Sequence, residues 1–130
     1  MTEREAFGLS ALTLAWVGDA VYELHMRTQL LTKSHKASTL SKLCVDLVNH
    51  GAQSKTLSGL EDHLTELEAQ VLRRGRNANG SVPRGGNAGD YRRATGLEAL
   101  VGYLYLSDQS DRLQELLSLV DKECGIECSG

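Results

Sequence analysis

The sequence predicts an all-helical fold, on three observations. Apolar residues recur at offsets of three and four along most of the chain, which is the spacing of a helix face buried against a core. No stretch of useful length alternates apolar and polar residues as a half-buried strand does. A chain of 130 residues is long enough to bury the core of one domain. Residues 1–130 are therefore expected to form one compact helical bundle.

The first long helix is predicted over residues 12–31, which are dense enough in apolar side chains to be buried on more than one side. Asp19 lies in the middle of this stretch, and an ionised carboxylate there must be solvated, paired with a cation or bound to a metal. Glu23 would lie on the same helical face. Alternatively, Gly18 and Asp19 mark a helix boundary at which Asp19 caps the next helix, and taken alone this stretch favours the cap.

Two further helical segments are expected before the middle of the chain. Ser38 or Thr39 can cap a helix whose apolar residues recur at helical offsets, and Gly51 is the expected stop. A second amphipathic segment covers residues 52–64, although Gly59 weakens it.

Thr65 and Glu68 form a capping box that opens a helix running to Gly75. The composition then changes, because residues 76–90 contain glycines, asparagines and the only proline, with no large apolar side chain. Such a segment cannot bury enough surface to order itself, so a mobile loop is expected. Long loops inside compact domains are usually functional.

The second strongly apolar helix is expected over residues 91–106, with Glu98 at its centre. The small residues Ala94 and Gly102 lie one turn to either side of Glu98, so another helix can approach closely and leave this acid semi-buried. A last amphipathic helix, over residues 111–122, completes the bundle.

Charge is distributed unevenly along the chain. The formal net charge is −3, which argues weakly against a nucleic-acid partner, but residues 73–93 contain six arginines and one acid, Asp90. An anionic polymer responds to such a local patch, not to the whole-chain charge. The candidate contacts to RNA, in the loop and its flanks, are Arg73, Arg74, Arg76, Asn77, Arg84, Tyr91, Arg92 and Arg93.

Two acids on two apolar helices repel each other when the helices meet, unless a cation lies between them. A hard divalent ion with oxygen ligands is the simplest such cation, and Mg²⁺ suits a site with few carboxylates because it retains water and takes substrate phosphate oxygens. Together with an arginine-rich loop, Asp19 and Glu98 therefore point to metal-assisted hydrolysis of a phosphodiester.

Three motifs carry a family resemblance. LAWVGDAVYELHMR, at residues 14–27, resembles the signature helix of the ribonuclease III catalytic domain, and TGLEALVGYLYL, at residues 95–106, resembles the second acidic motif of that family. RRGRNA, at residues 73–78, and the absence of an appended double-stranded-RNA-binding domain are similar to the Mini-ribonuclease III subgroup.

The resemblance implies an all-helical ribonuclease III-type domain that forms a two-fold homodimer and cleaves double-stranded RNA. It puts Asp19 and Glu98 at the catalytic, metal-binding positions, with Mg²⁺ as cofactor and Mn²⁺ as a substitute. For the family, the implied biological substrate is precursor 23S ribosomal RNA. A two-fold dimer has a physical logic, because cutting both strands of a duplex requires two sites related by symmetry.

The sequence departs from the larger enzymes of the family at two positions. Ala15 and Thr95 stand where those enzymes have further acids, which implies fewer protein ligands in this chain. The Thr95 hydroxyl and Glu23 are candidates for supporting roles around the ion. The same departures motivate an alternative, a catalytically inactive helical module that binds double-stranded RNA or assists assembly.

Targeting signals are absent from the sequence. The first residues are charged, and no apolar run approaches the ~20 residues of a membrane span, so a soluble protein without a membrane partner is expected. A cytoplasmic location is expected in a bacterium, or the plastid stroma if the source is a plant. Trp16, Tyr22, Tyr103 and Tyr105 lie in apolar runs, where core or dimer packing is the expected role.

Overall fold

The computed structural model describes residues 1–78 and 84–126, and every regular element in these ranges is a helix. This confirms the predicted fold class. In chain order the elements are α1 (Glu3–Phe7), α2 (Ala11–Leu30), α3 (Ala37–Val48), α4 (His50–Ser58), the 3₁₀ helix η1 (Glu61–His63), α5 (Glu66–Arg76), α6 (Ala88–Leu106) and α7 (Ser110–Glu123). None of the helices in the described ranges is both long enough and apolar enough to cross a bilayer.

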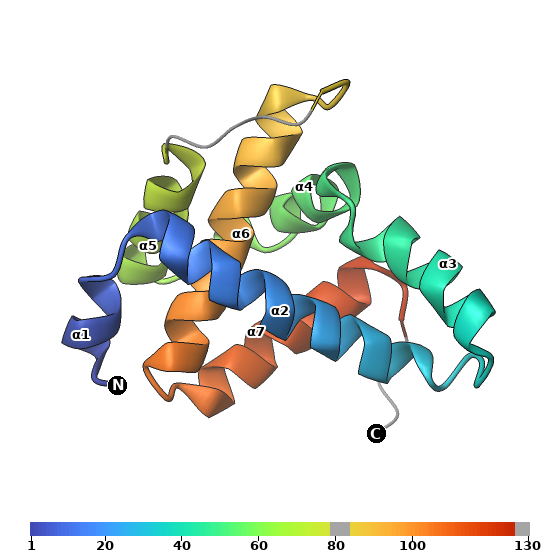
Figure 1. Cartoon of the computed structure of the whole chain (residues 1–130). Helices are drawn as coiled ribbons and strands as arrows, with labels where there is room; N and C mark the ends of the chain where they lie inside the picture. The colour runs from blue at the N-terminus through green and yellow to red at the C-terminus, as the bar shows by residue number, and fades with distance from the viewer. Residues whose placement is uncertain (79–83, 127–130) are drawn as a thin grey trace.

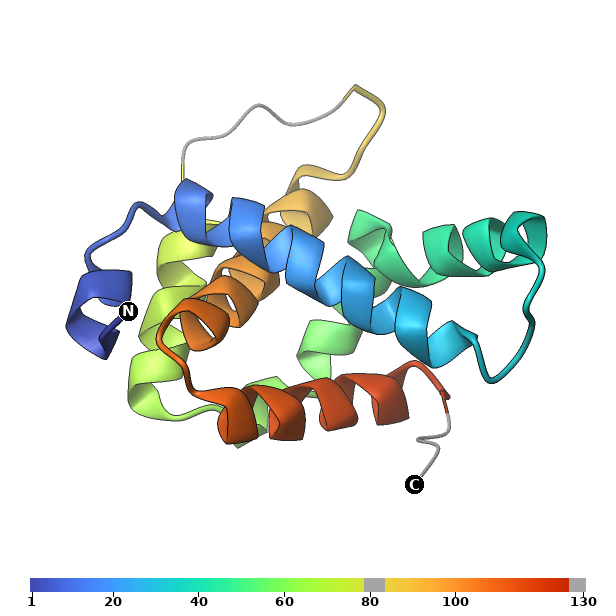
Figure 2. The same cartoon turned by 60° about the horizontal axis from the view of Figure 1, so that its bottom comes forward.

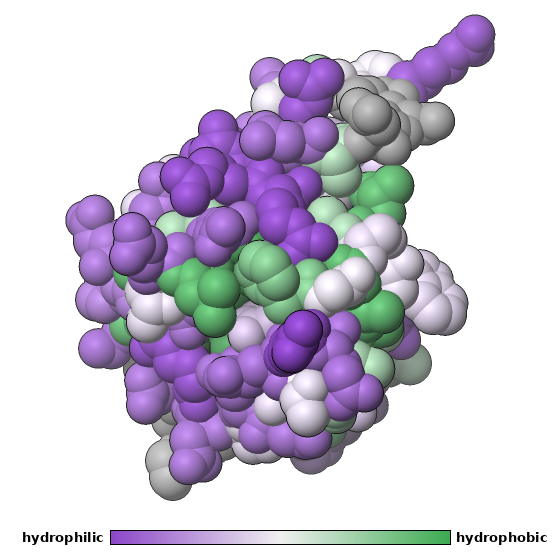
Figure 3. Space-filling view, turned by 90° about the vertical axis from the view of Figure 1, so that its left-hand side faces the viewer, coloured by the Kyte–Doolittle hydropathy of each residue, from purple (hydrophilic) through white to green (hydrophobic). Residues whose placement is uncertain are grey.

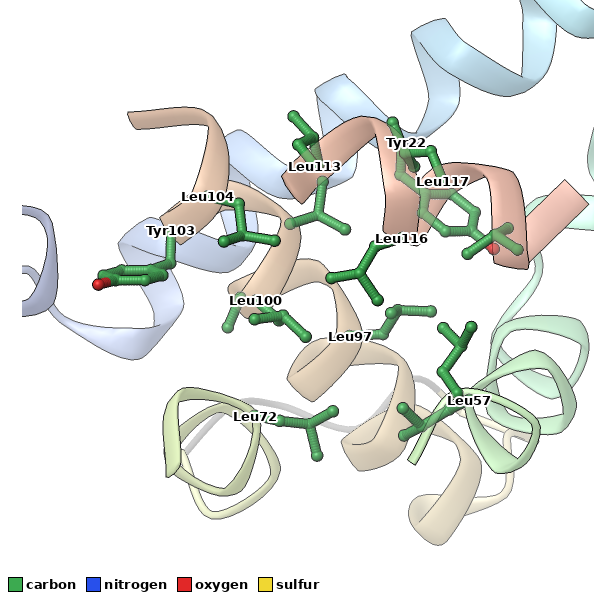
Figure 4. Close-up of a cluster of buried hydrophobic side chains, with 14 of the residues drawn as sticks. Tyr22, Leu57, Leu72, Leu97, Leu100, Tyr103, Leu104, Leu113, Leu116 and Leu117 are labelled. Carbon is green, nitrogen blue, oxygen red and sulfur yellow. The ribbon is translucent and has the colours of Figure 1, made fainter. Parts of the chain in front are cut away.

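Helix α6 is the centre of the bundle. Helices α2, α4 and α5 pack along it, and α1 and α7 also contact it (Figures 1 and 2). Almost every residue from Ala94 to Leu104 is buried, as expected for a helix that is surrounded on several sides. Figure 4 shows Leu97 and Leu100 of α6 among Leu57 of α4, Leu72 of α5 and the leucines of α7.

Helix α2 runs through Gly18 and Asp19 without a break, so the interpretation of Asp19 as a helix cap is wrong. The cap is Ser10, whose Oγ accepts a hydrogen bond from the backbone N–H of Thr13 at 3.1 Å. Packing against α6 outweighs the ~1 kcal/mol that a glycine costs inside a helix.

The predicted ends of the next two helices are also wrong. Helix α3 begins one residue before Ser38 and has no side-chain cap, so Ser38 and Thr39 lie inside its first turn. The break comes at Asn49, whose side chain accepts a hydrogen bond from the third residue after it and starts α4. Gly51 therefore lies inside α4, and Gly59 caps the C-terminus of that helix.

Capping boxes open two helices. The predicted box at Thr65 and Glu68 is confirmed, with both reciprocal hydrogen bonds present. A second box, at Thr2 and Glu5, opens α1, which the sequence analysis did not predict although the T-x-x-E pattern is there.

The predicted loop over residues 76–90 is shorter than expected at its C-terminal end. The Asn87 side chain accepts a hydrogen bond from the backbone N–H of Asp90 at 3.0 Å and starts α6 at Ala88. Residues 88–90 are thus helical. Residues 79–83, in the middle of the predicted loop, lie outside the described residues.

Candidate active site

Helices α2 and α6 cross in direct backbone contact, because a glycine on each helix faces the other. A Cβ added to Gly18 would overlap the Glu98 carbonyl oxygen and lie 2.8 Å from the Gly102 nitrogen. A Cβ added to Gly102 would overlap the Leu14 carbonyl oxygen. The prediction that a small residue beside Glu98 admits another helix is confirmed. Asp19 follows Gly18 directly, so the crossing brings the two acids together.

The electrostatics of Glu98 show how close the two carboxyl groups are. Burial raises the pKa of Glu98, and a hydrogen bond and charge repulsion from Asp19 raise it further, to about 9. Glu23 adds a smaller repulsion, whereas the Gln53 amide acts in the opposite direction. Without a cation at the site, one of the two acids therefore retains a proton at neutral pH.

The residues at this crossing fit a hard divalent ion. Two carboxyl groups that disfavour each other's ionised form gain from a cation, whose binding displaces the retained proton. Within the described ranges no group of three or more His, Cys, Asp and Glu side chains is placed to hold a metal. Asp19 and Glu98 would hold the ion as a pair, with water and substrate oxygens completing the shell, a pattern suited to Mg²⁺.

The two candidate supporting residues lie on the same helices. Glu23 is half-buried, accepts a hydrogen bond from Arg27 at 3.0 Å and lines the same surface groove as Asp19. The buried Thr95 hydroxyl donates to the Tyr91 carbonyl oxygen at 2.9 Å, which leaves its lone pairs for another donor.

Most of the predicted RNA contacts are available on the surface. Two hollows lie beside the end of α5. One is lined by Arg73 and Asn77 together with the start of α2, and the other by Arg76, Asn77 and Arg92. The Tyr91 ring is half-buried against His50. The exposed members of the predicted set are Arg73, Arg76, Asn77, Arg84 and Arg92.

Arg74 and Arg93 are committed to contacts within the fold. Arg74 donates to the backbone oxygens of Phe7 and Leu9, each at 2.9 Å, and lies over the Phe7 ring. Arg93 donates to two serines of α4 and to Glu61 at 3.0 Å. Their guanidinium groups tie α5 and α6 to neighbouring segments, so the exposed members of the set are the stronger candidates for contact with RNA.

Gln53 is a residue of the site that the sequence analysis did not select. It lies on α4 with only 1% of its surface exposed, and its amide is close enough to the Glu98 carboxyl to lower the pKa of that acid. The available signal was weak, a polar side chain one helical turn before the buried Leu57.

Comparisons with known proteins agree on one family. A model described as Ribonuclease III domain matches residues 12–109. The chain is 43% identical over 123 residues to the Mini-ribonuclease 3 of Desulfitobacterium hafniense, covering 94% of this chain and 78% of that relative. It is 48% identical to the Mini-ribonuclease 3 of Gloeobacter violaceus, covering 88% and 84%. A crystal structure of a protein from Fusobacterium nucleatum matches with a TM-score of 0.80 at 32% identity, covering 87% of this chain and 93% of that one.

Proposed function

The chain belongs to the ribonuclease III family, in its Mini-ribonuclease 3 group, and we propose that it is a metal-dependent endoribonuclease that hydrolyses phosphodiester bonds in double-stranded RNA. The observation that carries the proposal is the meeting of Asp19 and Glu98 where α2 crosses α6. When bound there, Mg²⁺, or Mn²⁺ in its place, supplies positive charge that activates water and stabilises the charge developing on the phosphate.

The two acids contribute differently to this site. Asp19 is exposed and offers its carboxylate on the side from which a substrate approaches, whereas Glu98 is half-buried on the central helix. Glu98 gives up its proton when the ion binds. The backbone contact at Gly18 and Gly102 fixes the separation of the two side chains, so little reorganisation is needed on binding.

The exposed basic residues at the end of α5 and beside the start of α6 are proposed to bind the RNA backbone. A-form duplexes are recognised mostly by shape, through phosphates and 2′-hydroxyls, and this suits arginine and asparagine side chains. We propose precursor 23S ribosomal RNA as the substrate and the cytoplasm of a bacterium, or the plastid stroma of a plant, as the location. The proposed contacts are Arg73, Arg76, Asn77, Arg84, Tyr91 and Arg92.

An exposed apolar surface beside Asp19 supports a homodimer. Trp16, Leu24 and Tyr105 are 78%, 67% and 54% exposed, and they line one groove together with Asp19 and Glu23. Figure 3 shows that hydrophobic residues also gather among hydrophilic ones on the side of α1 and α5. A second copy packed on the apolar surface would be related by a two-fold axis and would bring two sites near one duplex. Trp16→Glu should convert a dimer into a monomer in analytical ultracentrifugation, and a monomeric wild type would contradict the dimer.

Cleavage of a short RNA duplex tests the activity. Asp19→Asn and Glu98→Gln are expected to abolish cleavage in Mg²⁺ while duplex binding in a gel-shift assay persists. Glu66→Gln, which changes an exposed acid at the start of α5, is the control and should cleave normally. Wild-type protein that shifts the duplex without cutting it would establish the inactive RNA-binding module instead.

A further inference from the structure

Gln53 has an unsatisfied polar atom at the candidate metal site. Its side chain comes from α4, which packs against α6, and its amide lies close enough to the Glu98 carboxyl to lower the pKa of that acid. Its Oε1 is shielded from solvent and has no hydrogen-bond partner among the described residues. The two polar atoms of an amide are held in one rigid plane, so Oε1 also lies near the Glu98 carboxyl.

An unpaired buried carbonyl is costly, at about 1–3 kcal/mol. An apolar side chain of similar length would avoid that cost on the face of α4 that carries Leu57. The hydroxyls of Tyr22 and Tyr103 also lack hydrogen-bond partners within the described residues. Gln53 differs from them because its amide lies beside the carboxyl of a candidate metal ligand, Glu98. Its free oxygen therefore points to a partner that residues 1–78 and 84–126 do not supply.

We propose that Gln53 is a positioning residue of the metal site, with Oε1 accepting a hydrogen bond from water that coordinates the ion. This inference rests on the proposed function, since it requires a divalent ion at Asp19 and Glu98. Charge supports an amide at this place. The two carboxylates already balance a divalent ion, and an amide adds an oxygen without adding charge.

Gln53→Met tests the proposal, because methionine fills a similar volume and removes both polar atoms. The probe is Mn²⁺ alone, whose free concentration is followed by electron paramagnetic resonance during titration. Loss of a residue that supports metal ligands typically costs 10–100-fold in affinity, so Gln53→Met should weaken Mn²⁺ binding at least about 10-fold. Ser107→Ala, which removes another buried polar group away from the site, should bind Mn²⁺ like the wild type.

Gln53→Glu provides the second arm of the test. It retains acceptor oxygens and adds a negative charge, so Mn²⁺ should bind at least as tightly as to the wild type, a result that does not depend on Gln53→Met folding. Wild-type affinity in Gln53→Met, or weakened affinity in Gln53→Glu, overturns the proposal. If Asp19→Asn abolishes Mn²⁺ binding in the same experiment, the proposed function stands without Gln53. If Asp19→Asn binds Mn²⁺ normally, the metal site itself is wrong.

Discussion

Gly102→Ala tests whether the helix crossing sets the geometry of the active site. A Cβ at Gly102 would overlap the Leu14 carbonyl oxygen and lie 3.0 Å from the Gly18 nitrogen. Both neighbours are backbone atoms, which cannot rotate away as a side chain can. Restoring the ~3.5 Å separation of unstrained contacts pushes α2 and α6 apart by roughly 1.5 Å. That movement separates Asp19 from Glu98.

Two effects set the stability of this variant. Overpacking costs about 1–3 kcal/mol, and the better helix propensity of alanine returns up to about 1 kcal/mol. The protein should therefore stay folded with a net loss of up to about 3 kcal/mol. Activity should fall further, because a misplacement of about 1 Å costs about 100-fold in rate.

The assay is single-turnover cleavage of an RNA duplex in saturating Mg²⁺, combined with urea unfolding. Gly51→Ala is the matched control, since Gly51 also lies inside a helix but an added Cβ would meet nothing closer than 3.5 Å. This control should keep its activity and gain up to about 1 kcal/mol of stability. A Gly102→Ala variant that loses stability but cleaves at the wild-type rate would refute the role of the crossing.

Three other predictions follow from charged side chains. Arg76→Ala and Arg92→Ala should each weaken duplex binding, and each should reduce the magnitude of the slope of log K against log salt concentration by about one. Fluorescence anisotropy measures both quantities, and unchanged slopes would exclude both residues from the interface. Burial and the neighbouring Asp19 carboxyl raise the pKa of Glu98 from 4.5 to about 9. The free energy of unfolding of the metal-free wild type should therefore fall as the pH rises from 4.5 to 9, by at most about 1.4 kcal/mol per pH unit. Glu98→Gln should remove this dependence in urea unfolding with a chelator, and parallel curves would contradict the raised pKa. Burial raises the pKa of Glu68, but hydrogen bonds from Arg112 at 2.8 and 2.9 Å outweigh burial and leave the pKa below its usual value of 4.5. The Glu68 carboxylate therefore stabilises the fold above about pH 4.5, and this stabilisation disappears in acid. Glu68→Gln should cost about 1–3 kcal/mol at pH 7, measured by thermal unfolding, and little at pH 3.

The meeting of the two acids was predictable because it depends on local composition. Ala94 and Gly102 are small residues on the Glu98 face of one helix, and Gly18 precedes Asp19 on the other. Gly18 was interpreted as a possible helix boundary, so its place in the crossing was not predicted. Gln53 was not predictable in this way, because its role depends on which face of α4 meets α6.

Helix starts at asparagine were missed for a related reason. Asn87 lies in a stretch whose composition indicates a loop, and Asn49 follows an apolar run without any glycine or proline. Each becomes a cap through a hydrogen bond from its own side chain, at 3.0 Å for Asn87 and 2.9 Å for Asn49. Two neighbouring arginines also lie in different environments, since Arg73 is exposed whereas Arg74 is hydrogen-bonded to the end of α1 and the residues that follow it. Successive residues on a helix point about 100° apart, so equal local charge does not imply equal environment.

Helix α2 has more apolar side chains than the fold of one chain buries. The sequence predicts burial on more than one side, yet the fold covers Leu14, Tyr22 and Met26 and leaves Trp16 and Leu24 exposed. An apolar pattern indicates that side chains are buried, but it does not show whether the same chain or a second copy buries them. The apolar side chains that remain exposed line the groove that also contains Asp19. A second copy seated there would satisfy the apolar pattern and place its own acids near the same duplex, so one surface would serve both assembly and double-strand cleavage.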